Sequence, residues 1–311
     1  MSSWKFALVA AFVAFGSWGI AEAEGPASPK EVAAILSGTD GSEPAFDQGA
    51  IARTAGPVVR EETAASPSRP TWTGGASTSD QGELQTDFGL QWQSMGMGVG
   101  QMVLPSSVRY GVTSRLELRW GLPAHMTQSG GGTAPLEGVS DQNLSALYRF
   151  HEQGSRMPAL AFDYGVKIPS ANPAKGFGTG YTDHQLVFVA SRDLGRAHFD
   201  FNLVGTVAGE PYGHDGAAQC GLALSLAVTN RFTWVLDNYG GPQPGTADRY
   251  GAALSGGTWA LRPWLVVDAA YTRAYTAGAP RQQFTVGITH AMKPGFGSAF
   301  KSARVARLLG R

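Results

Sequence analysis

From residue 82 to residue 290 the sequence alternates apolar and polar residues with a period of two, and no helical pattern interrupts the repeats. In the first repeat, Leu84, Phe88 and Trp92 fall on one side, while Gln85 and Asp87 fall on the other. Successive side chains of a strand point to opposite faces of a sheet, which gives this period. The chain is therefore expected to be all-β and antiparallel.

The repeats predict about twelve strands, an even number as in bacterial single-chain barrels. They are expected at residues 82–93, 101–110, 115–122, 141–150, 159–168, 183–191, 197–207, 218–228, 232–238, 249–261, 264–271 and 282–290. Apart from 94–100, their connections alternate between a short class, such as 192–196, and a long class, such as 123–140 and 169–182. Outer-membrane barrels have short periplasmic turns and longer outer loops, whereas β-sandwiches follow no such rule. The sequence thus predicts a transmembrane β-barrel over residues 72–291.

Composition supports a surface that faces lipid. Only 15% of the residues are charged, against about 25% in a typical soluble protein. Aromatic residues fall near the ends of the predicted strands, where amphipathic rings anchor a barrel at the lipid headgroups, although aromatics are common in any β structure. The aromatic girdle candidates are Trp92, Tyr110, Trp120, Tyr148, Trp234, Tyr250, Trp264 and Tyr271.

Residues 1–23 have the pattern of a secretory signal peptide. Lys5 precedes an apolar run from Phe6 to Phe15, and the small-residue triplet Ala21–Ala23 follows. The run is too short to cross a bilayer as a helix, which takes about 20 residues. We expect export through the secretory pathway and a location in the outer membrane.

Two segments flank the predicted barrel. Residues 24–71 are rich in Pro, Ala, Ser and Glu and lack apolar periodicity, so they are expected to form a disordered periplasmic segment. Residues 292–311 carry basic residues and no acid, and form a basic tail. This tail is expected to be solvated, with contact to acidic partners or headgroups as the alternative.

Charge and cysteine content exclude several functions. The 24 basic residues balance the 24 acidic ones, so no global field favours nucleic acid. Cys220 is the only cysteine, which excludes an intrachain disulfide and a cysteine-based zinc site. No metal and no cofactor is expected.

The face opposite the apolar one is expected to line the lumen. Its candidates are Glu83, Asp87, Arg109, Arg115, Glu117, Arg119, Arg149, Asp163, Lys167, His198, Asp200, Asp237, Arg249 and Asp268. Because acids and bases nearly balance, little preference between cations and anions is expected. These side chains either line a wet channel or pair with one another and fill the barrel.

Catalytic chemistry has weak support. His198 and Asp200 share a predicted strand face, as a base and its orienting carboxylate would, but no Gly-x-Ser-x-Gly motif supplies a serine. His151 and Ser155 fall in a predicted turn. The glycine-rich stretch at 176–180 leads into no helix that could receive a phosphate. The protein is expected not to be an enzyme.

One stretch resembles a known family. Residues 108–118, Val-Arg-Tyr-Gly-Val-Thr-Ser-Arg-Leu-Glu-Leu, are similar to the hallmark hairpin of a family named for the meta-cleavage pathway of phenol degradation. Residues 138–144, leading to Tyr148, and residues 180–183 resemble two further stretches of that family. The resemblance covers about residues 82–290 and leaves out the two flanking segments. It implies an outer-membrane barrel labelled as a transporter, and it implies no catalytic or ligand residues.

The expected function is a channel for small molecules, for which the resemblance implies aromatic or otherwise apolar solutes. Connections 123–140 and 169–182 are long enough to fold over the mouth and act as a gate. The alternatives are a closed structural or adhesion barrel that acts through its outer loops and, less favoured, an outer-membrane enzyme. Expected partners are outer-membrane lipid, a small-molecule solute and, during biogenesis, the barrel-assembly machinery.

Overall fold

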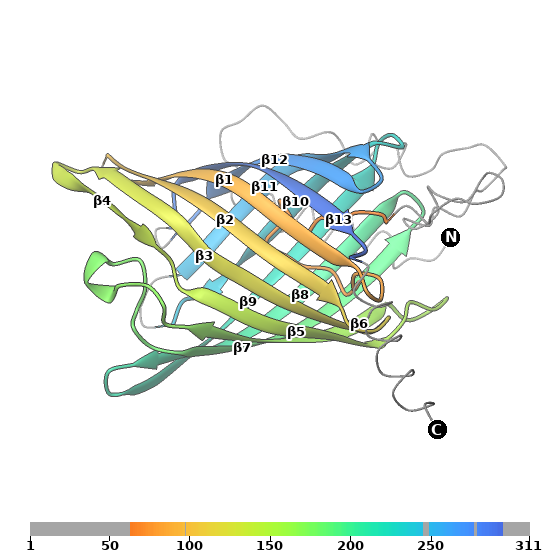
Figure 1. The fold of residues 1–311 in the computed structure, drawn as a ribbon, viewed down its shortest axis with the longest axis horizontal. Helices are drawn as coiled ribbons and strands as arrows, with labels where there is room; N and C mark the ends of the chain where they lie inside the picture. Colours follow the sequence, from red (N-terminus) through yellow and green to blue (C-terminus); the bar gives the residue numbers. More distant parts are fainter. Residues whose placement is uncertain (1–62, 97, 245–248, 277–278, 295–311) are drawn as a thin grey trace, which may run out of the picture.

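The structure, a computed structural model, describes residues 63–96, 98–244, 249–276 and 279–294 (Figure 1). The expected signal peptide, residues 24–62 of the expected periplasmic segment and the basic tail from residue 295 lie outside this part of the chain. Among the described residues there are thirteen strands and one short 3₁₀ helix, η2 at Pro173–Lys175. The strands are β1 Leu84–Gly96, β2 Val99–Gly111, β3 Leu116–Gly130, β4 Thr133–Val139, β5 Gln142–His151, β6 Ala159–Ile168, β7 Asp183–Leu194, β8 Ala197–Glu210, β9 Gly213–Ala227, β10 Phe232–Pro242, β11 Arg249–Arg262, β12 Leu265–Ala274 and β13 Gln282–Met292.

The strands form one antiparallel sheet that closes on itself. Apart from β4 and β5, consecutive strands pair with each other, and β1 pairs with β13 from Leu84 opposite Met292 to Ser94 opposite Gln282. Strand β3 has two partners on one edge, β5 along its first half and β4 along its second. Because β4 and β5 together fill one position, the barrel has twelve strand positions. The predicted fold class is confirmed.

Strand β1 illustrates the two faces. Phe88 is 53% exposed and points outward, whereas its neighbour Asp87 is 2% exposed and points into the barrel. Leu118 and Phe162 on other strands are exposed in the same way as Phe88. A barrel of this kind places apolar side chains on the outer surface because lipid replaces water there.

The connections divide into two ends. Turns such as 112–115 and 195–196 are short, and the chain enters β1 and leaves β13 at this end. At the other end, much of the predicted connection 123–140 is a hairpin of β3 and β4, and most of 208–217 extends β8 and β9. The expectation that 123–140 folds over the mouth is therefore wrong, since its backbone pairs along the wall and continues it.

Candidate functional site

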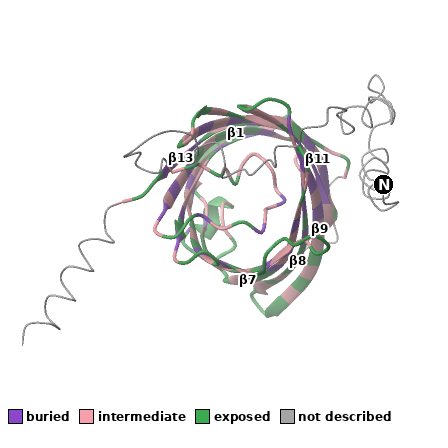
Figure 2. Ribbon diagram, turned by 90° about the vertical axis from the view of Figure 1, so that its right-hand side faces the viewer, coloured by how far each residue is buried: buried purple, intermediate pink, exposed green. Residues whose placement is uncertain are grey.

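The lumen contains part of the chain itself. Residues 65–82, here called the plug segment, pass through the interior before β1 begins, and Figure 2 shows this chain inside the ring of strands. The segment enters at the turn end, where the Ala65 N–H donates to the Pro263 carbonyl (2.7 Å). It leaves at the same end, where the Gly82 N–H donates to the Gly111 carbonyl (2.7 Å). Residues 63–71 thus lie in and beside the barrel, and the expected domain boundary at residue 71 is wrong.

Asp237 on β10 holds the middle of the plug segment. Its carboxylate accepts hydrogen bonds from the backbone N–H of Trp72 (2.7 Å), from the N–H of Thr73 (2.8 Å) and from the Thr73 hydroxyl (2.6 Å). The Trp72 ring stacks on Tyr239, with centroids 5.0 Å apart and planes 7° from parallel. Hydrogen bonds to an ionised acceptor are stronger than neutral ones, so this is a firm attachment.

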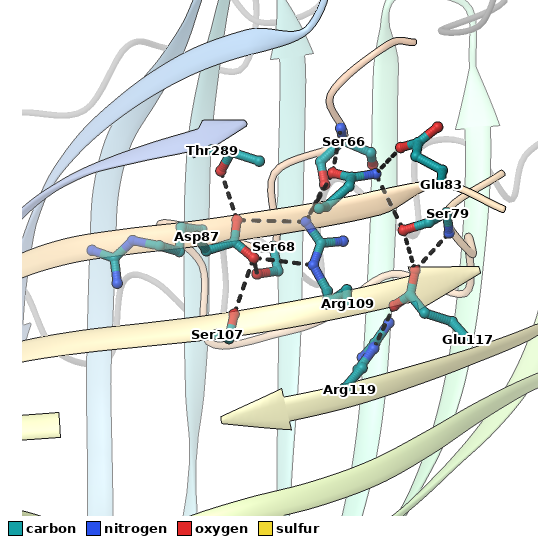
Figure 3. A network of polar contacts seen from close by, with 12 residues as sticks. Ser66, Ser68, Ser79, Glu83, Asp87, Ser107, Arg109, Glu117, Arg119 and Thr289 are labelled. Atoms are coloured by element: carbon teal, nitrogen blue, oxygen red, sulfur yellow. Dashed lines mark hydrogen bonds and ion pairs between the residues drawn. The ribbon is translucent and has the colours of Figure 1, made fainter. Parts of the chain in front are cut away.

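Asp87 on β1 is the centre of a second network (Figure 3). It accepts from Arg109 Nε (3.0 Å), the Thr289 hydroxyl (2.7 Å) and, from the plug segment, the Ser68 hydroxyl (3.2 Å). Arg109 also donates to the Ser66 carbonyl (2.7 Å). The wall and the plug segment therefore share one set of hydrogen bonds.

Glu117 on β3 holds the end of the plug segment (Figure 3). Its Oε2 accepts from both the N–H and the hydroxyl of Ser79, each at 2.5 Å. Its other oxygen pairs with Arg119 Nε (2.6 Å), and Arg119 Nη1 in turn pairs with Asp163 Oδ2 (2.9 Å). This ion-pair chain links β3 to β6.

Arg69 of the plug segment lies against two further strands. Its guanidinium donates to the Thr285 hydroxyl and lies 3.6 Å from an Asp268 oxygen. The Asp268 side chain is 1% exposed, and its carboxylate accepts no hydrogen bond from any described residue. Arg69 is thus the nearest compensating charge for a deeply buried acid.

Apolar contacts complete the docking. Ala76 is fully buried against Leu147, Ala161, Val187 and other inward apolar side chains of the wall. Its N–H donates to the Ser191 hydroxyl (2.8 Å). Apolar residues on an inward face would be exposed to lumen water without such a cover, so the wall is built to receive the plug segment.

The predicted lumen acids all lie with their side chains inside the barrel: Glu83, Asp87, Glu117, Asp163, Asp200, Asp237 and Asp268. The predicted bases divide. Arg109, Arg119, Lys167 and His198 lie inside, but Arg115 and Arg149 lie at the rim of the turn end, near Glu152.

The prediction that Arg249 lines the lumen is wrong. Arg249 is paired with Pro242, on the face of β11 that carries the exposed Trp259, and is itself exposed on the outside. Arg149 is at the rim but on the inward face of β5, so two predicted bases, Arg115 and Arg249, are outside the lumen. The seven inward acids therefore outnumber the inward bases, and the wall is acidic. The expected balance of lumen charge is therefore wrong.

The aromatic girdle candidates lie mostly outside. Exposed fractions are between 37% and 50% for Trp92, Tyr110, Trp120, Tyr148, Trp234 and Trp264. Tyr271 is half-buried against Phe284 on the same outer face. The prediction that Tyr250 belongs to the outer aromatic girdle is also wrong, because Tyr250 points into the barrel and stacks on Tyr239 (5.7 Å between centroids).

The histidine considered as a base is held between two acids. His198 Nδ1 lies 2.6 Å from Asp193 and Nε2 lies 3.0 Å from Asp200. The hydroxyl of Ser191 donates to Asp200 rather than to the imidazole. A catalytic serine needs the histidine as its hydrogen-bond acceptor, so this order does not activate Ser191.

His151 and Ser155 lie apart from this cluster. His151 Nδ1 contacts the Pro158 carbonyl (3.1 Å) within its own turn, and the Ser155 carbonyl accepts from Arg192 (2.8 Å). In the described part of the chain, no three His, Cys, Asp or Glu side chains group as metal ligands would. No helix among the described residues has the length and apolarity to span a bilayer.

A second charged cluster, not predicted, lies where β4 ends and β5 begins. Lys167 Nζ is 2.6 Å from Asp183 and 3.8 Å from Asp141. It also donates to the Thr179 hydroxyl (2.7 Å), while Asp141 accepts from the Ala171 N–H (2.9 Å). These contacts hold the connection 169–182 beside the point where β4 ends and β5 begins. The period of two in the sequence did not indicate that the wall changes from one strand to another at this point.

Glu83, just before β1, lies beside the plug segment and is 1% exposed. Burial raises the pKa of its carboxyl to about 7, and the nearby Asp80 carboxylate raises it further. Gln85 Nε2 donates to Glu83 Oε1 (2.6 Å), which favours the ionised form without outweighing burial.

Comparison with known proteins gives likeness in fold. Neither the protein-family models nor the curated proteins gave a match to the sequence. Among solved structures, the chain is similar to the COG4313 outer membrane channel from Pseudomonas putida F1. The TM-score is 0.53 and the identity 14%, over 70% of this chain and 98% of that one.

Two weaker similarities are to the NanC porin and to the CymD monoaromatic hydrocarbon channel. The NanC porin has a TM-score of 0.44 and 10% identity over 67% of this chain and 98% of that one. The CymD channel has a TM-score of 0.38 and 10% identity over 68% of this chain and 88% of that one. At these identities the first similarity establishes an outer-membrane barrel fold, and the other two add nothing to it.

Proposed function

We propose that this protein is an outer-membrane channel for small solutes and that the plug segment closes it in the conformation described. The observation that carries the proposal is a barrel whose lumen is occupied by a segment of its own chain, bound mainly to inward polar side chains of the wall. Hydrogen bonds, the Arg69–Asp268 ion pair, one ring stack and the apolar contacts of Ala76 hold this segment, and water can replace the hydrogen bonds if the segment moves. The similarity in fold to the COG4313 channel supports the proposal.

The outer surface supports the location in the outer membrane. Phe88, Leu118 and Phe162 are between 42% and 53% exposed on three different strands. Exposed apolar residues on so many strands would promote aggregation in water, whereas they match a bilayer. Export by the secretory pathway and insertion by the barrel-assembly machinery belong to the same proposal.

The width of the barrel favours a channel over a purely structural barrel. Eight strands enclose a space that wall side chains can fill, whereas sixteen or more leave an open aqueous pore. Twelve positions lie between these limits, and here a segment of the chain occupies much of the space that the wall side chains leave. The closed structural or adhesion barrel remains a second candidate because the plug segment occupies the lumen.

Two criteria, polarity and charge, define the proposed class of solute. The resemblance to the phenol-degradation family implies apolar or aromatic solutes, and the acidic wall favours cations or neutral molecules over anions. Like charges along a lumen raise the energy of an entering ion of the same sign.

Single-channel recording in planar bilayers tests the proposal. The full chain is compared with Asp237→Asn, which weakens the attachment of Trp72 and Thr73, and with Arg249→Gln on the outer surface as a matched control. We expect longer or more frequent openings for Asp237→Asn than for the full chain and the control. Absence of conductance in all three proteins, each shown to be folded by its mobility shift on heating, would favour the structural barrel.

A further inference from the structure

Arg69 of the plug segment lies on a floor that two glycines of the wall form. Gly89 on β1 and Gly287 on β13 are opposite each other in the pairing of these strands. A methyl group on Gly89 would lie 2.6–2.7 Å from the guanidinium carbon and both terminal nitrogens of Arg69, and one on Gly287 would lie 2.6 Å from its Nε. Because the three distances at Gly89 are nearly equal, the flat face of the guanidinium lies on this glycine. A side chain at either position would collide with it.

Polar groups border this floor. Asp268 on β12 pairs with Gly287, and a methyl group on Gly287 would lie 2.5 Å from Asp268 Oδ2, so the carboxylate points at the place that Arg69 occupies. The Thr285 hydroxyl accepts a hydrogen bond from Arg69 Nη2. Gly89, Gly287, Asp268 and Thr285 are here called the Arg69 recess. A flat floor with acceptors beside it suits a guanidinium group, whose N–H donors all lie in one plane.

Arg69 occupies this recess without using its strongest acceptor. Its Nε lies 3.6 Å from Asp268 Oδ2, and neither this N–H nor either carboxylate oxygen has a hydrogen-bond partner among the described residues. The neighbouring Ser68 is bound to Asp87 (3.2 Å), which limits how Arg69 can turn. A guanidinium group that is not tied to the plug segment can turn and donate two parallel N–H groups to Asp268, which is the stronger, bidentate arrangement. A free ligand therefore gains hydrogen bonds that Arg69 does not make.

The charge of the recess favours a cation. Asp87 is close enough to interact with Asp268, but it is already paired with Arg109 (3.0 Å). Arg69 is the one base within ion-pair distance of Asp268 in the described part of the chain. When Arg69 leaves, Asp268 is a buried charge without a partner, which is costly, so the next occupant is favoured if it carries a positive charge. The Arg69 side chain is 16% exposed inside the barrel, so water in the lumen reaches this site.

We infer that the Arg69 recess is a binding site for solutes that carry a guanidinium group, and that Arg69 is the internal ligand which these solutes displace. The guanidinium lies flat on Gly89 and Gly287 and donates to both oxygens of Asp268. The inference rests on the proposed channel only in its last step, in which displacement of Arg69 weakens the docking of the plug segment and favours opening.

Three probes with one butyl chain test the inference by titration calorimetry of folded protein in detergent. Butylguanidinium is compared with butylurea, which has the same planar shape without the charge, and with butylammonium, which has the charge without the planar group. Arg69→Ala vacates the recess. We expect this variant to bind butylguanidinium at least about tenfold more tightly than butylurea, because hydrogen bonds to charged groups are the stronger ones. It should also bind butylguanidinium more tightly than butylammonium.

The full chain supplies the competition. There Arg69 acts as a tethered ligand, so butylguanidinium should bind the full chain at least about tenfold more weakly than Arg69→Ala. Equal affinity of the three probes for Arg69→Ala would overturn the inference, and so would equal affinity of butylguanidinium for Arg69→Ala and the full chain. If Arg69→Ala does not fold, the full chain decides. It must then prefer butylguanidinium to butylurea, and Asp268→Asn must remove that preference.

Second substitutions in Arg69→Ala locate the binding. Asp268→Asn removes the charge at constant size and should weaken butylguanidinium at least about tenfold. Gly89→Ala puts a methyl group on the floor and should weaken it by a similar factor. The matched control is Gly121→Ala on β3, where the nearest atom would lie 3.5 Å from the new methyl group, and it should leave the affinity unchanged. Butylguanidinium that binds Asp268→Asn as tightly as its parent would contradict the site.

Binding and conductance separate the inference from the proposed function. Butylguanidinium binding to Arg69→Ala, with no conductance in this variant or in the full chain, would keep the site and refute the channel. Channel openings in the full chain that butylguanidinium does not promote, together with no binding to Arg69→Ala, would keep the channel and refute the site.

Discussion

Loss of a single hydroxyl at Thr73 should release the plug segment measurably. Thr73→Val keeps the shape of the side chain and the backbone N–H bond to Asp237, but removes the 2.6 Å hydrogen bond from the hydroxyl to the carboxylate. A hydrogen bond to a charged group contributes about 1.5–3 kcal/mol. The undocked state should therefore become about 10- to 150-fold more populated.

A cysteine at a docked position can report this population. Ala76 is fully buried between the plug segment and the wall, and Cys220 is the only native cysteine. In a Cys220→Ser background, Ala76→Cys should react with a maleimide only when the plug segment leaves the wall. If redocking is faster than the reaction, the labelling rate follows the undocked fraction. Thr73→Val should raise this rate about 10- to 150-fold.

The matched control is Thr206→Val, which removes a hydroxyl from the inward face of β8 where its contact is a weak one to Gln185 (3.4 Å). It should change the labelling rate less than twofold. Equal rates for Thr73→Val and the control would refute the reasoning, because Asp237 would then contribute nothing to docking. Fast labelling already in the Ala76→Cys parent would show that the plug segment does not dock.

Three further outcomes are expected. Phe88→Arg, on the lipid face, should destabilise the barrel by about 2–4 kcal/mol in urea unfolding from bilayers, whereas Gln91→Arg on the lumen face should cost much less; equal costs would reverse the two faces. Because burial raises the pKa of Glu83 to about 7, stability should fall as pH rises from about 4.5 through 7, by up to about 3 kcal/mol. Glu83→Gln should abolish this fall in urea titrations at pH 5 and 8, and an unchanged pH dependence would assign it to other groups. In a salt gradient, the reversal potential of the channel opened by Thr73→Val should show a preference for cations; a preference for anions would contradict the acidic wall.

The barrel itself could be predicted from the sequence because its period of two is local. Every strand carries its own alternation, and Phe88 beside Asp87 is enough to orient β1. At the start of β11 the sequence has no such alternation of apolar and polar residues. Gly251, Ala252 and Ala253 are small on both faces, so nothing nearby shows that Tyr250 points inward and Arg249 outward.

The plug segment could not be predicted in the same way. Its residues lack periodicity because backbone N–H groups and small hydroxyls make most of its contacts, and these look alike in a disordered chain. The partners are also distant in sequence, since Asp237 lies 164 positions after Thr73.

One signal was nevertheless present in the sequence. Inward acids such as Asp237 and Asp268 have no nearby inward base on their own strands. A wall with unmatched carboxylates needs donors from elsewhere, and here the plug segment provides them.

The short connection between the plug segment and β1 also determines how the lumen is closed. Ser79, bound to Glu117, is separated from the first residue of β1 by only residues 80–83. The blocker is therefore a tethered ligand, whose effective concentration at its site is set by the linker, in the millimolar range for short flexible linkers. The closed fraction should not change when the protein is diluted, and a free peptide copy of the segment would have to reach a comparable concentration to compete. Closure of this barrel is an intramolecular equilibrium, which each molecule carries with it wherever it is inserted.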